Sequence, residues 1–499
     1  MLDGSGAGKS SAYSIPNAYQ CLGSYIFTDP KGELYDKTAG YLKEKGYEIK
    51  VLNLVNPKNS DGYNPLIHIQ NEIDVDVIAN TIVKGQAKES TSADPYWDDM
   101  AEMLLKALIY YLIATRPPEE QNLASCSELV RAANSNGGGN LLTELMNQLP
   151  YDHPARMNYK SIEIAPEKTY GSILSSLQSK LGKFDSKEIA ELTSTNTINF
   201  EDIGNKKTAL YVISSDTHGA YDFLLTIFFA QMIQHLYDSA DKTGGTLKIP
   251  TFFILDEFAN IGKIPDFDKK ISTSRSRKIS FSVILQNLDQ LEAVYEKSHE
   301  TIIGNCDTTI FLGSNSQKTV EYFSKELGEK TIERTSVSAS KDKHMWRQGY
   351  NVSDQVMARA LMTPDELRRL DSDKCIILEK GIKPIKADKY YYFKYKTNDL
   401  VKKYAVSHND IEMDRGVWRK YNPYNPYVES EEEHPNNNIE SLDDLFEEDE
   451  KKEENENKIV AEQTAPKEET KEVYDIQKEL EEKFDELFGS LDDNNNATN

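Results

Sequence analysis

The sequence is poor in cysteine and contains no long hydrophobic run. Its four cysteines, Cys21, Cys126, Cys306 and Cys375, have neither the spacing of paired metal ligands nor the density of a disulfide framework. No stretch of about 18 apolar residues occurs, and no charged and then apolar leader follows Met1. These absences exclude a disulfide scaffold and a membrane span within this sequence, and they favour the reducing cytosol. We expect any membrane attachment to come from elsewhere.

Acidic residues outnumber basic ones, 82 to 58. The formal net charge is −24, but residues 429–499 hold 26 acidic and 7 basic residues, which leaves only −5 for the first 428 residues. Along that mildly acidic body, no Lys/Arg stripe with interleaved aromatic residues forms an electrostatic footprint for nucleic acid. Any contact with nucleic acid has to come from a few basic residues that the sequence does not locate.

Short apolar segments alternate with helical segments, which predicts an α/β protein. The length of 499 residues gives an expectation of about three domains. Apolar strands are expected at residues 24–28, 47–55, 208–214, 251–255, 279–285, 308–312 and 374–378. Helices such as 97–115 and 222–240 separate them, which indicates a parallel sheet covered on both faces. Only helical patterns fill residues 119–192, and these predict an inserted all-α subdomain.

The composition changes after Trp418, first to a Tyr-Asn-Pro segment and then to Glu, Asp, Asn and Lys. This acidic tail has too little apolar surface to offset its chain entropy, so it is expected to be disordered. Two apolar islands with helical spacing, at 439–446 and 476–491, interrupt it. They either fold against a partner groove or form transient helices that bind nothing, and the sequence leaves both readings open.

A glycine-rich segment at residues 4–11, GSGAGKSS, predicts a phosphate-binding P-loop. Its small residues let successive backbone N–H groups curl around an anion, Lys9 can reach the outer phosphates, and the Ser10 hydroxyl can ligate magnesium. The expected nucleotide-binding residues are Gly4, Ser5, Gly6, Ala7, Gly8, Lys9 and Ser10. The alternative is a flexible glycine-rich terminus.

The start of this motif departs from the usual pattern in two ways. Asp3 stands where the motif has its first glycine. The strand that launches such a loop is expected to be absent, because the numbering starts at Met1. Either the product is truncated, or the numbering starts inside a longer protein.

A second motif, FFILDEFANIG at residues 252–262, ends an apolar strand in adjacent carboxylates. A strand buried beside the loop would hold Asp256 where it binds magnesium through water, and Glu257 where it polarises the attacking water. The alternative is an ordinary helix start with an N-cap aspartate and a first-turn acid. The P-loop at residues 4–11 favours the catalytic reading, with ATP and Mg²⁺ as ligands.

Three more side chains flank the strand expected at 279–285. Arg275 and Arg277 precede it, and a fixed guanidinium there could stabilise charge on the nucleotide of a neighbouring subunit. The alternative is a solvated basic helix end paired with nearby acids. Gln286 follows the strand, where its amide could sense the outer phosphate or orient water, unless it is an ordinary loop glutamine.

These segments together resemble the TraG-like type IV coupling proteins of conjugation and type IV secretion, the Gram-positive branch in particular. The similarity covers residues 4 to about 395. The blocks that carry it are GSGAGKS at 4–10, TDPKGEL at 28–34, YNPL at 63–66, DPYW at 94–97, PPEEQN at 117–122, ILDEFANIGKIPDF at 254–267, SRSRKISFSVILQNLDQL at 274–291, IGNCDTTIFLG at 303–313 and LMTPDELRRL at 361–370.

The resemblance implies a RecA-like P-loop NTPase in which Lys9 and Ser10 bind nucleotide and magnesium. It also implies that Arg275 and Gln286 lie near the phosphates, with Arg275 preferred over Arg277 as the arginine finger. Such proteins form a homo-hexameric ring on the cytoplasmic face of the cell membrane, where the all-α insert contacts the relaxosome and cargo. They usually carry transmembrane helices ahead of the phosphate loop, which this sequence lacks.

The expected organisation follows from these motifs. A nucleotide-binding domain is split into residues 1–95 and 196–395 around an all-α insert at 96–195, followed by a connecting segment at 396–428 and the acidic tail at 429–499. The leading hypothesis is an ATP-driven motor that delivers relaxase-bound single-stranded DNA, or protein, to a type IV secretion channel. The alternatives are a substrate-docking receptor that does not hydrolyse ATP, and a HerA- or FtsK-like DNA pump, which the DPKGEL and DEFANIG blocks disfavour.

Overall fold

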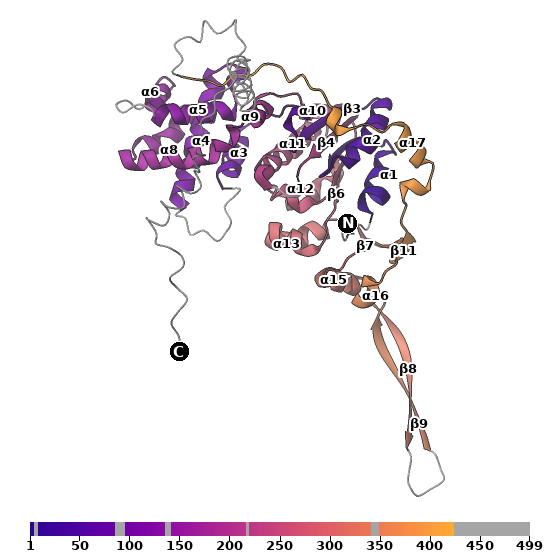
Figure 1. Cartoon of the computed structure of the whole chain (residues 1–499). Helices are drawn as coiled ribbons and strands as arrows, with labels where there is room; N and C mark the ends of the chain where they lie inside the picture. Colours follow the sequence, from indigo (N-terminus) through magenta and orange to yellow (C-terminus); the bar gives the residue numbers. More distant parts are fainter. Residues whose placement is uncertain (4–7, 85–94, 135–140, 216–218, 341–348, 424–499) are drawn as a thin grey trace, which may run out of the picture. The chain divides into compact units, whose positions relative to one another are not determined.

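The computed structural model describes residues 1–3, 8–84, 95–134, 141–215, 219–340 and 349–423. A five-stranded parallel sheet in the order β3-β4-β2-β5-β6 carries the fold (Figure 1). Its strands are β2 (Ser24–Thr28), β3 (Glu48–Asn53), β4 (Thr208–Ile213), β5 (Thr251–Leu255) and β6 (Ile279–Val283). All five fall within predicted strands, which confirms the central parallel sheet. The acidic tail and its two islands lie outside the described residues.

Both faces of this sheet are covered, because alternate side chains of a strand point to opposite sides. Tyr25 and Phe27 join a core with α1 (Ile15–Ala18) and α2 (Glu33–Glu44), whereas Ile26 joins the core that contains α11 (Asp222–Lys242). The β2 and β4 strands are buried at every position. This explains why they read as continuous apolar runs.

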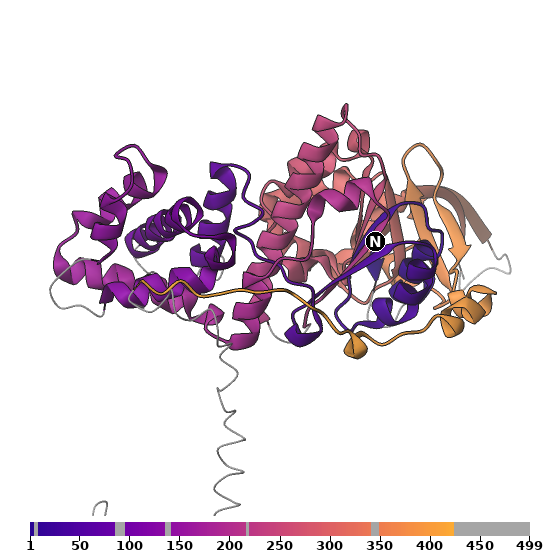
Figure 2. The same cartoon turned by 90° about the horizontal axis from the view of Figure 1, so that it is seen from above.

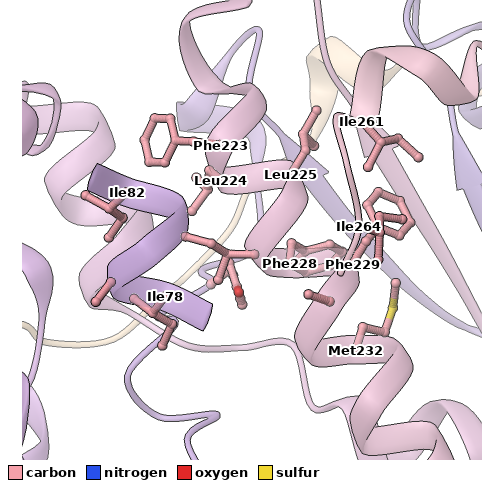
Figure 3. Close-up of a cluster of buried hydrophobic side chains, with 14 of the residues drawn as sticks. Ile78, Ile82, Phe223, Leu224, Leu225, Phe228, Phe229, Met232, Ile261 and Ile264 are labelled. Carbon is pink, nitrogen blue, oxygen red and sulfur yellow. The ribbon is translucent and has the colours of Figure 1, made fainter. Parts of the chain in front are cut away.

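Helix α11 is buried on nearly all sides. Figure 3 shows its phenylalanines and leucines between Ile78 and Ile82 of α3 (Glu72–Lys84) on one side and Ile261 and Ile264 on the other. A helix in such a position needs apolar residues around its whole circumference, and the sequence of α11 provides them. Through this helix the sheet and the helical insert share one continuous core.

A second sheet, in the order β1-β7-β10-β11, continues from β6. Its strands are β1 (Leu2–Asp3), β7 (Thr308–Gly313), β10 (Lys374–Glu379) and β11 (Ile385–Asp388). The β10 strand runs antiparallel to β7, and β11 runs antiparallel to β10. The strands at 308–312 and 374–378 were therefore predicted correctly, but the all-parallel arrangement was wrong at this edge.

The short β1 strand corrects the expectation that the launching strand is absent. Leu2 pairs with Phe311 of β7 in parallel and bridges to Leu285, which follows β6. The Met1 nitrogen donates to the Val283 carbonyl at 2.6 Å, and the Leu285 N–H donates to the Met1 carbonyl at 3.0 Å. A short strand therefore precedes the glycine-rich segment, and it connects β7 of the second sheet with the segment that follows β6.

Seven helices make up a separate helical block: α3, α4 (Pro95–Thr115), α5 (Leu123–Asn134), α6 (Leu141–Asn147), α7 (Pro154–Glu163), α8 (Glu167–Leu181) and α9 (Lys187–Ser194). Helix α4 is its centre, in contact with α3, α5, α7 and α8. The predicted helices of residues 119–192 are present, but α3, which the predicted insert at 96–195 left out, also packs against α4 and α8. Within the described ranges, no helix combines the length and apolarity that a bilayer crossing needs.

The remaining helices surround the two sheets. They are α10 (Phe200–Asn205), α12 (Phe267–Thr273), α13 (Leu288–Tyr295), α14 (His299–Gly304), α15 (Gln317–Leu327), α16 (Pro364–Arg368) and α17 (Thr397–Lys403). Between α15 and α16 the chain forms a long antiparallel ribbon of β8 (Glu329–Ser340) and β9 (Gly349–Ala360), which Figure 1 shows clearly. The sequence analysis missed this ribbon, because both of its faces are rich in serine, threonine and charge.

The segment after α17 runs back along the protein to the helical block (Figure 2). The Arg415 guanidinium donates to the Ser60 carbonyl, and the Arg419 N–H donates to the Glu119 carbonyl. The Tyr421 N–H donates to the Ser125 hydroxyl, and its ring packs beneath the Arg116 guanidinium. The described part of the predicted connecting segment, residues 396–423, therefore contacts both the loop after β3 and the helical block.

Candidate nucleotide-binding site

Four predicted site residues meet at one edge of the sheet. Because β2, β5 and β6 are parallel, their carboxyl ends lie side by side, next to the loop that follows β1. Asp256 and Glu257 follow β5, and Gln286 follows β6. Lys9 enters from the loop and lies within ion-pair distance of both carboxylates.

The loop residues that the structure describes have the expected form. Gly8 has φ +96°, and a Cβ there would lie 2.8 Å from Cε1 of Tyr391, so only glycine fits. Its carbonyl accepts from the Ala12 N–H at 2.7 Å. A π-helical turn at Ser10–Ser14 then continues into α1, so Ser10 stands at the start of a helix. Gly4, Ser5, Gly6 and Ala7 lie outside the described residues.

Lys9 holds the two carboxylates together. Its Nζ lies 2.9 Å from Asp256 Oδ1 and 3.0 Å from Glu257 Oε1. Burial alone would lower the pKa of the Lys9 ammonium, but the two carboxylates more than offset that effect and raise it above its ordinary value. Lys9 is therefore a permanent cation at this edge of the sheet.

Asp256 is buried, with 6% of its side chain exposed. Burial, with a smaller contribution from Glu257, raises the pKa of Asp256 above its usual range, while Lys9 opposes the rise. The Thr28 hydroxyl fixes the backbone by donating to the Asp256 carbonyl at 2.7 Å. Among the described residues, Asp256 Oδ1 has no hydrogen bond of ordinary geometry, only the ion pair with Lys9. A buried carboxylate oxygen in that state fits a magnesium-bound water.

Glu257 is held in an unusual backbone conformation with φ +52°. Such strain in a residue other than glycine persists only where its surroundings fix it, and it concentrates at functional sites. The Gln286 amide donates to Glu257 Oε1 at 3.1 Å, and the Asn260 amide donates to Oε2 at 3.1 Å. The alternative made Asp256 the N-cap of a helix, but only a 3₁₀ turn (Phe258–Ile261) follows, its N-cap position is Glu257, and the Glu257 side chain makes no cap hydrogen bond.

A hollow of about 270 Å³ opens over these groups. The residues that line it are Gly8, Lys9, Ser10, Ser11, Asp29, Pro30, Lys31, Glu33, Asp256, Glu257 and Gln286. The sequence analysis gave no role to Asp29, Thr28 or Asn260, although each lies within a block that it quoted. The signal for Asp29 was its place directly after a buried strand, the same place that Asp256 has after β5.

Asp29 predicts a pH effect on stability. Burial raises the pKa of Asp29 to about 6, against the backbone N–H groups of Leu34 and Tyr35, which lower it. The folded protein then holds a proton between about pH 4 and 6 that the unfolded chain has lost, so the free energy of unfolding falls as pH rises through this window. Asp29→Asn should remove that slope. Urea unfolding of both proteins measures the difference in free energy of unfolding between Asp29→Asn and wild type. This difference should shift in favour of the variant by about 1 to 3 kcal/mol between pH 4.5 and pH 7. A difference that is the same at both pH values contradicts the raised pKa of Asp29.

The two arginines behave differently. Arg277 donates twice to the Asp241 carboxylate, at 3.0 and 3.1 Å, and lies over the ring of Tyr237. Arg277 therefore has the structural role given above as the alternative, that of a solvated basic helix end paired with a nearby acid. Arg275 is 91% exposed, and its one ion pair within the described part of the chain is with Asp307 at 3.6 Å. Both precede β6 and so lie at its amino end, whereas Lys9 lies at the carboxyl end; the structure does not bring Arg275 to this site within one chain.

The fold and the site together define a class. A parallel sheet whose carboxyl edge gathers a glycine loop, a lysine and a strand-end carboxylate pair is the arrangement of a RecA-like P-loop NTPase. The chain belongs to the family of type IV secretory system conjugative DNA transfer proteins, whose family model matches residues 1–414.

Individual relatives agree with this family. The chain is 25% identical over 415 residues to protein VirD4 of Rhizobium radiobacter, covering 78% of this chain and 56% of that protein. It is 25% identical over 393 residues to the conjugal transfer protein TraG of Escherichia coli, covering 74% of this chain and 61% of TraG. It therefore spans less than two thirds of either relative.

Solved structures agree on the fold. The bacterial conjugative coupling protein TrwBdeltaN70, in its trigonal form with sulphate, matches with a TM-score of 0.56 at 16% identity, over 78% of this chain and 84% of that one. TrwB in complex with the non-hydrolysable ATP analogue ADPNP matches with a TM-score of 0.55 at 16% identity.

Proposed function

We propose that this chain is the ATP-hydrolysing part of a conjugative coupling protein. The observation that carries the proposal is the bridge from Lys9 to both Asp256 and Glu257, across 247 and 248 positions of sequence, at the carboxyl edge of a parallel sheet. The family of the chain and the ATP analogue bound by TrwB support nucleotide binding. The substrate would be relaxase-bound single-stranded DNA, or protein, passed to a type IV secretion channel.

Each residue has a role in this proposal. The loop amides and Lys9 would bind the phosphates of ATP, with Lys9 leaving the carboxylates for the triphosphate. Ser10 and Asp256 would hold Mg²⁺, which when bound neutralises charge on the outer phosphates. Glu257 would orient and polarise the attacking water, and Gln286 would keep Glu257 in place through the 3.1 Å hydrogen bond. Phosphate oxygens and water would complete the coordination of Mg²⁺, as is usual for this ion at nucleotide sites.

The proposal extends to the assembly. A homo-hexameric ring at the cytoplasmic face of the cell membrane would place Arg275 of one subunit near the nucleotide of the next, because an exposed arginine at the amino end of β6 cannot serve its own site. The second candidate is a docking receptor with weak or lost hydrolysis, which the substitution of Asp3 for the first motif glycine favours.

The test compares Arg275 with its neighbour Arg277. Purified protein should hydrolyse ATP with Mg²⁺, and faster with single-stranded DNA. Arg275→Ala should reduce that rate by about a thousandfold or more, as expected for an arginine finger supplied by a neighbour. Arg277→Ala is the matched control, because its contacts with Asp241 and Tyr237 are structural; it should lower the melting temperature and change the rate far less.

Mixing separates the two candidate functions. Subunits with Arg275→Ala, mixed with subunits with Lys9→Ala, should recover part of the activity, since each supplies what the other lacks. Equal rates for wild type and Arg275→Ala would remove the finger from the proposal. The same assay can be run on a version that is extended upstream and has the motif glycine restored. If that version binds ATP with magnesium but does not hydrolyse it, the docking receptor is favoured over the motor.

A further inference from the structure

The β8–β9 ribbon separates its charges by sign. Residues paired across an antiparallel ribbon share a face, and successive residues alternate between faces. The pairs Lys330↔Arg359 and Arg334↔Gln355 therefore lie on one face. The pairs Glu329↔Ala360, Glu333↔Val356 and Thr335↔Asp354 lie on the other. All three cations of the two strands lie on the first face, here called the basic face, and all three acids lie on the second, the acidic face.

These charges have few partners in the chain itself. Arg359 pairs with Glu366 at 2.6 Å, next to the base of the ribbon. Among the described residues, Lys330, Arg334, Glu329, Glu333 and Asp354 make no ion pair, and all five are exposed. Like charges on one face of a two-stranded ribbon repel each other and do not stabilise the fold. Binding to an external partner therefore explains the separation of charges better than folding does.

Each face also exposes apolar side chains. On the acidic face, Val352 is 58% and Val356 is 69% exposed; on the basic face, Met357 is 42% exposed. Each face thus combines exposed apolar side chains with charges of a single sign. Such a combination is typical of a protein interface that has a charged rim. Because both faces carry this combination, the partner should also present both signs.

We infer that the basic face of one ribbon binds the acidic face of the ribbon of a second copy of this chain. Lys330 and Arg334 are four residues apart, as are Glu329 and Glu333, so the two ladders have the same repeat of roughly 13 Å. Two ribbons that point the same way can therefore match cation to acid along their length. This contact is head-to-tail, the type that closes a ring when the rotation allows it.

The size of the contact sets its strength. Strands of 12 residues extend roughly 40 Å, and a two-stranded ribbon is roughly 10 Å wide, so one face offers roughly 400 Å². The two partners together bury roughly 800 Å², which is below the size of a stable interface and in the weak, transient range. The ribbon contact should therefore be sensitive to salt and should reinforce assembly through other surfaces. It does not depend on ATP hydrolysis.

Charge reversal tests the inference on the full chain. Lys330→Glu with Arg334→Glu makes both faces acidic, and Glu329→Lys with Glu333→Lys makes both faces basic. Each pair should weaken self-association by about tenfold or more at low salt, because like charges then meet. The four substitutions together exchange the faces and should restore self-association. Sedimentation velocity at several protein and salt concentrations measures these constants.

Two further arms make the result unambiguous. Lys325→Glu with Lys380→Glu, two exposed lysines outside the ribbon, changes the net charge equally and should leave self-association unchanged. An equal mixture of the two face variants should associate, since one then has two acidic faces and the other two basic ones.

A nucleic-acid partner is the other outcome for the basic face, because lysine and arginine also bind phosphates. Binding of labelled single-stranded DNA, followed by anisotropy, distinguishes the two. The inference predicts that the four-substitution variant regains self-association. It is overturned if the variant stays dissociated, if wild type does not self-associate at all, or if Lys330→Glu with Arg334→Glu weakens only DNA binding.

Discussion

Glu257→Gln should reduce the rate of ATP hydrolysis by about 100- to 10,000-fold, while the variant still binds ATP. Glutamine keeps the shape of the side chain but cannot take up the proton or polarise the attacking water as a carboxylate does. Its amide can still hydrogen-bond with Gln286 and Asn260, which contact Glu257 at 3.1 Å each. The affinity for ATP should therefore change little, because Lys9 and the loop stay in place.

The measurement combines steady-state hydrolysis with binding of a fluorescent ATP analogue. Glu33→Gln is the matched control, since Glu33 lines the same hollow but pairs with Lys37 rather than with Lys9. The control should retain at least about half of the wild-type rate. If Glu257→Gln hydrolyses ATP like wild type, or if both variants lose activity to the same extent, then Glu257 is not the residue that activates water.

The sequence predicted most of this site because the motifs lie at strand ends. A run of buried apolar residues such as Thr251–Leu255 can be read as a strand, and whatever follows it has to lie at the sheet edge. That reasoning placed Asp256 and Glu257 beside the phosphate loop, whereas only the resemblance to coupling proteins favoured a role for Gln286. It could not predict the conformation of Glu257 at φ +52°, which depends on contacts with residues far away in the sequence.

Other features were beyond the sequence for different physical reasons. None of the ribbon side chains that the structure describes, at 329–336 and 352–360, is buried, so the ribbon lacks the alternation of apolar and polar residues that reveals most strands. Arg275 precedes β6 in the sequence, and the parallel pairing of β6 with β5 puts that amino end opposite to Asp256 and Glu257. The resemblance to coupling proteins implied that Arg275 lies near the phosphates, but the structure does not bring it there within one chain, and its action on the nucleotide of a neighbouring subunit stays a proposal.

Lys9→Ala should have two separable effects, and the first is on ligand binding. The variant should lose about 100-fold or more in affinity for ATP, because a charge-assisted contact with the outer phosphates disappears. Hydrolysis should fall at least as much. Lys31→Ala is the control for net charge, since Lys31 also lines the hollow but has no contact with either carboxylate among the described residues.

The second effect of Lys9→Ala is on the protein without nucleotide. Asp256, with 6% of its side chain exposed, loses the cation 2.9 Å away, so its pKa should rise further. The folded variant then keeps a proton that the unfolded chain has lost, and its free energy of unfolding should fall as pH rises from about 4 towards 7.

At pH 7 the variant should be about 1 to 3 kcal/mol less stable than wild type, and at pH 4.5 the deficit should be smaller. Urea unfolding at both pH values measures this difference. Lys9→Ala with Asp256→Asn should recover stability at pH 7, because the uncompensated carboxylate is gone, yet it should not recover ATP binding. A deficit that is the same at both pH values, or a double variant no more stable than Lys9→Ala, would show that Lys9 and Asp256 are not coupled in the folded protein.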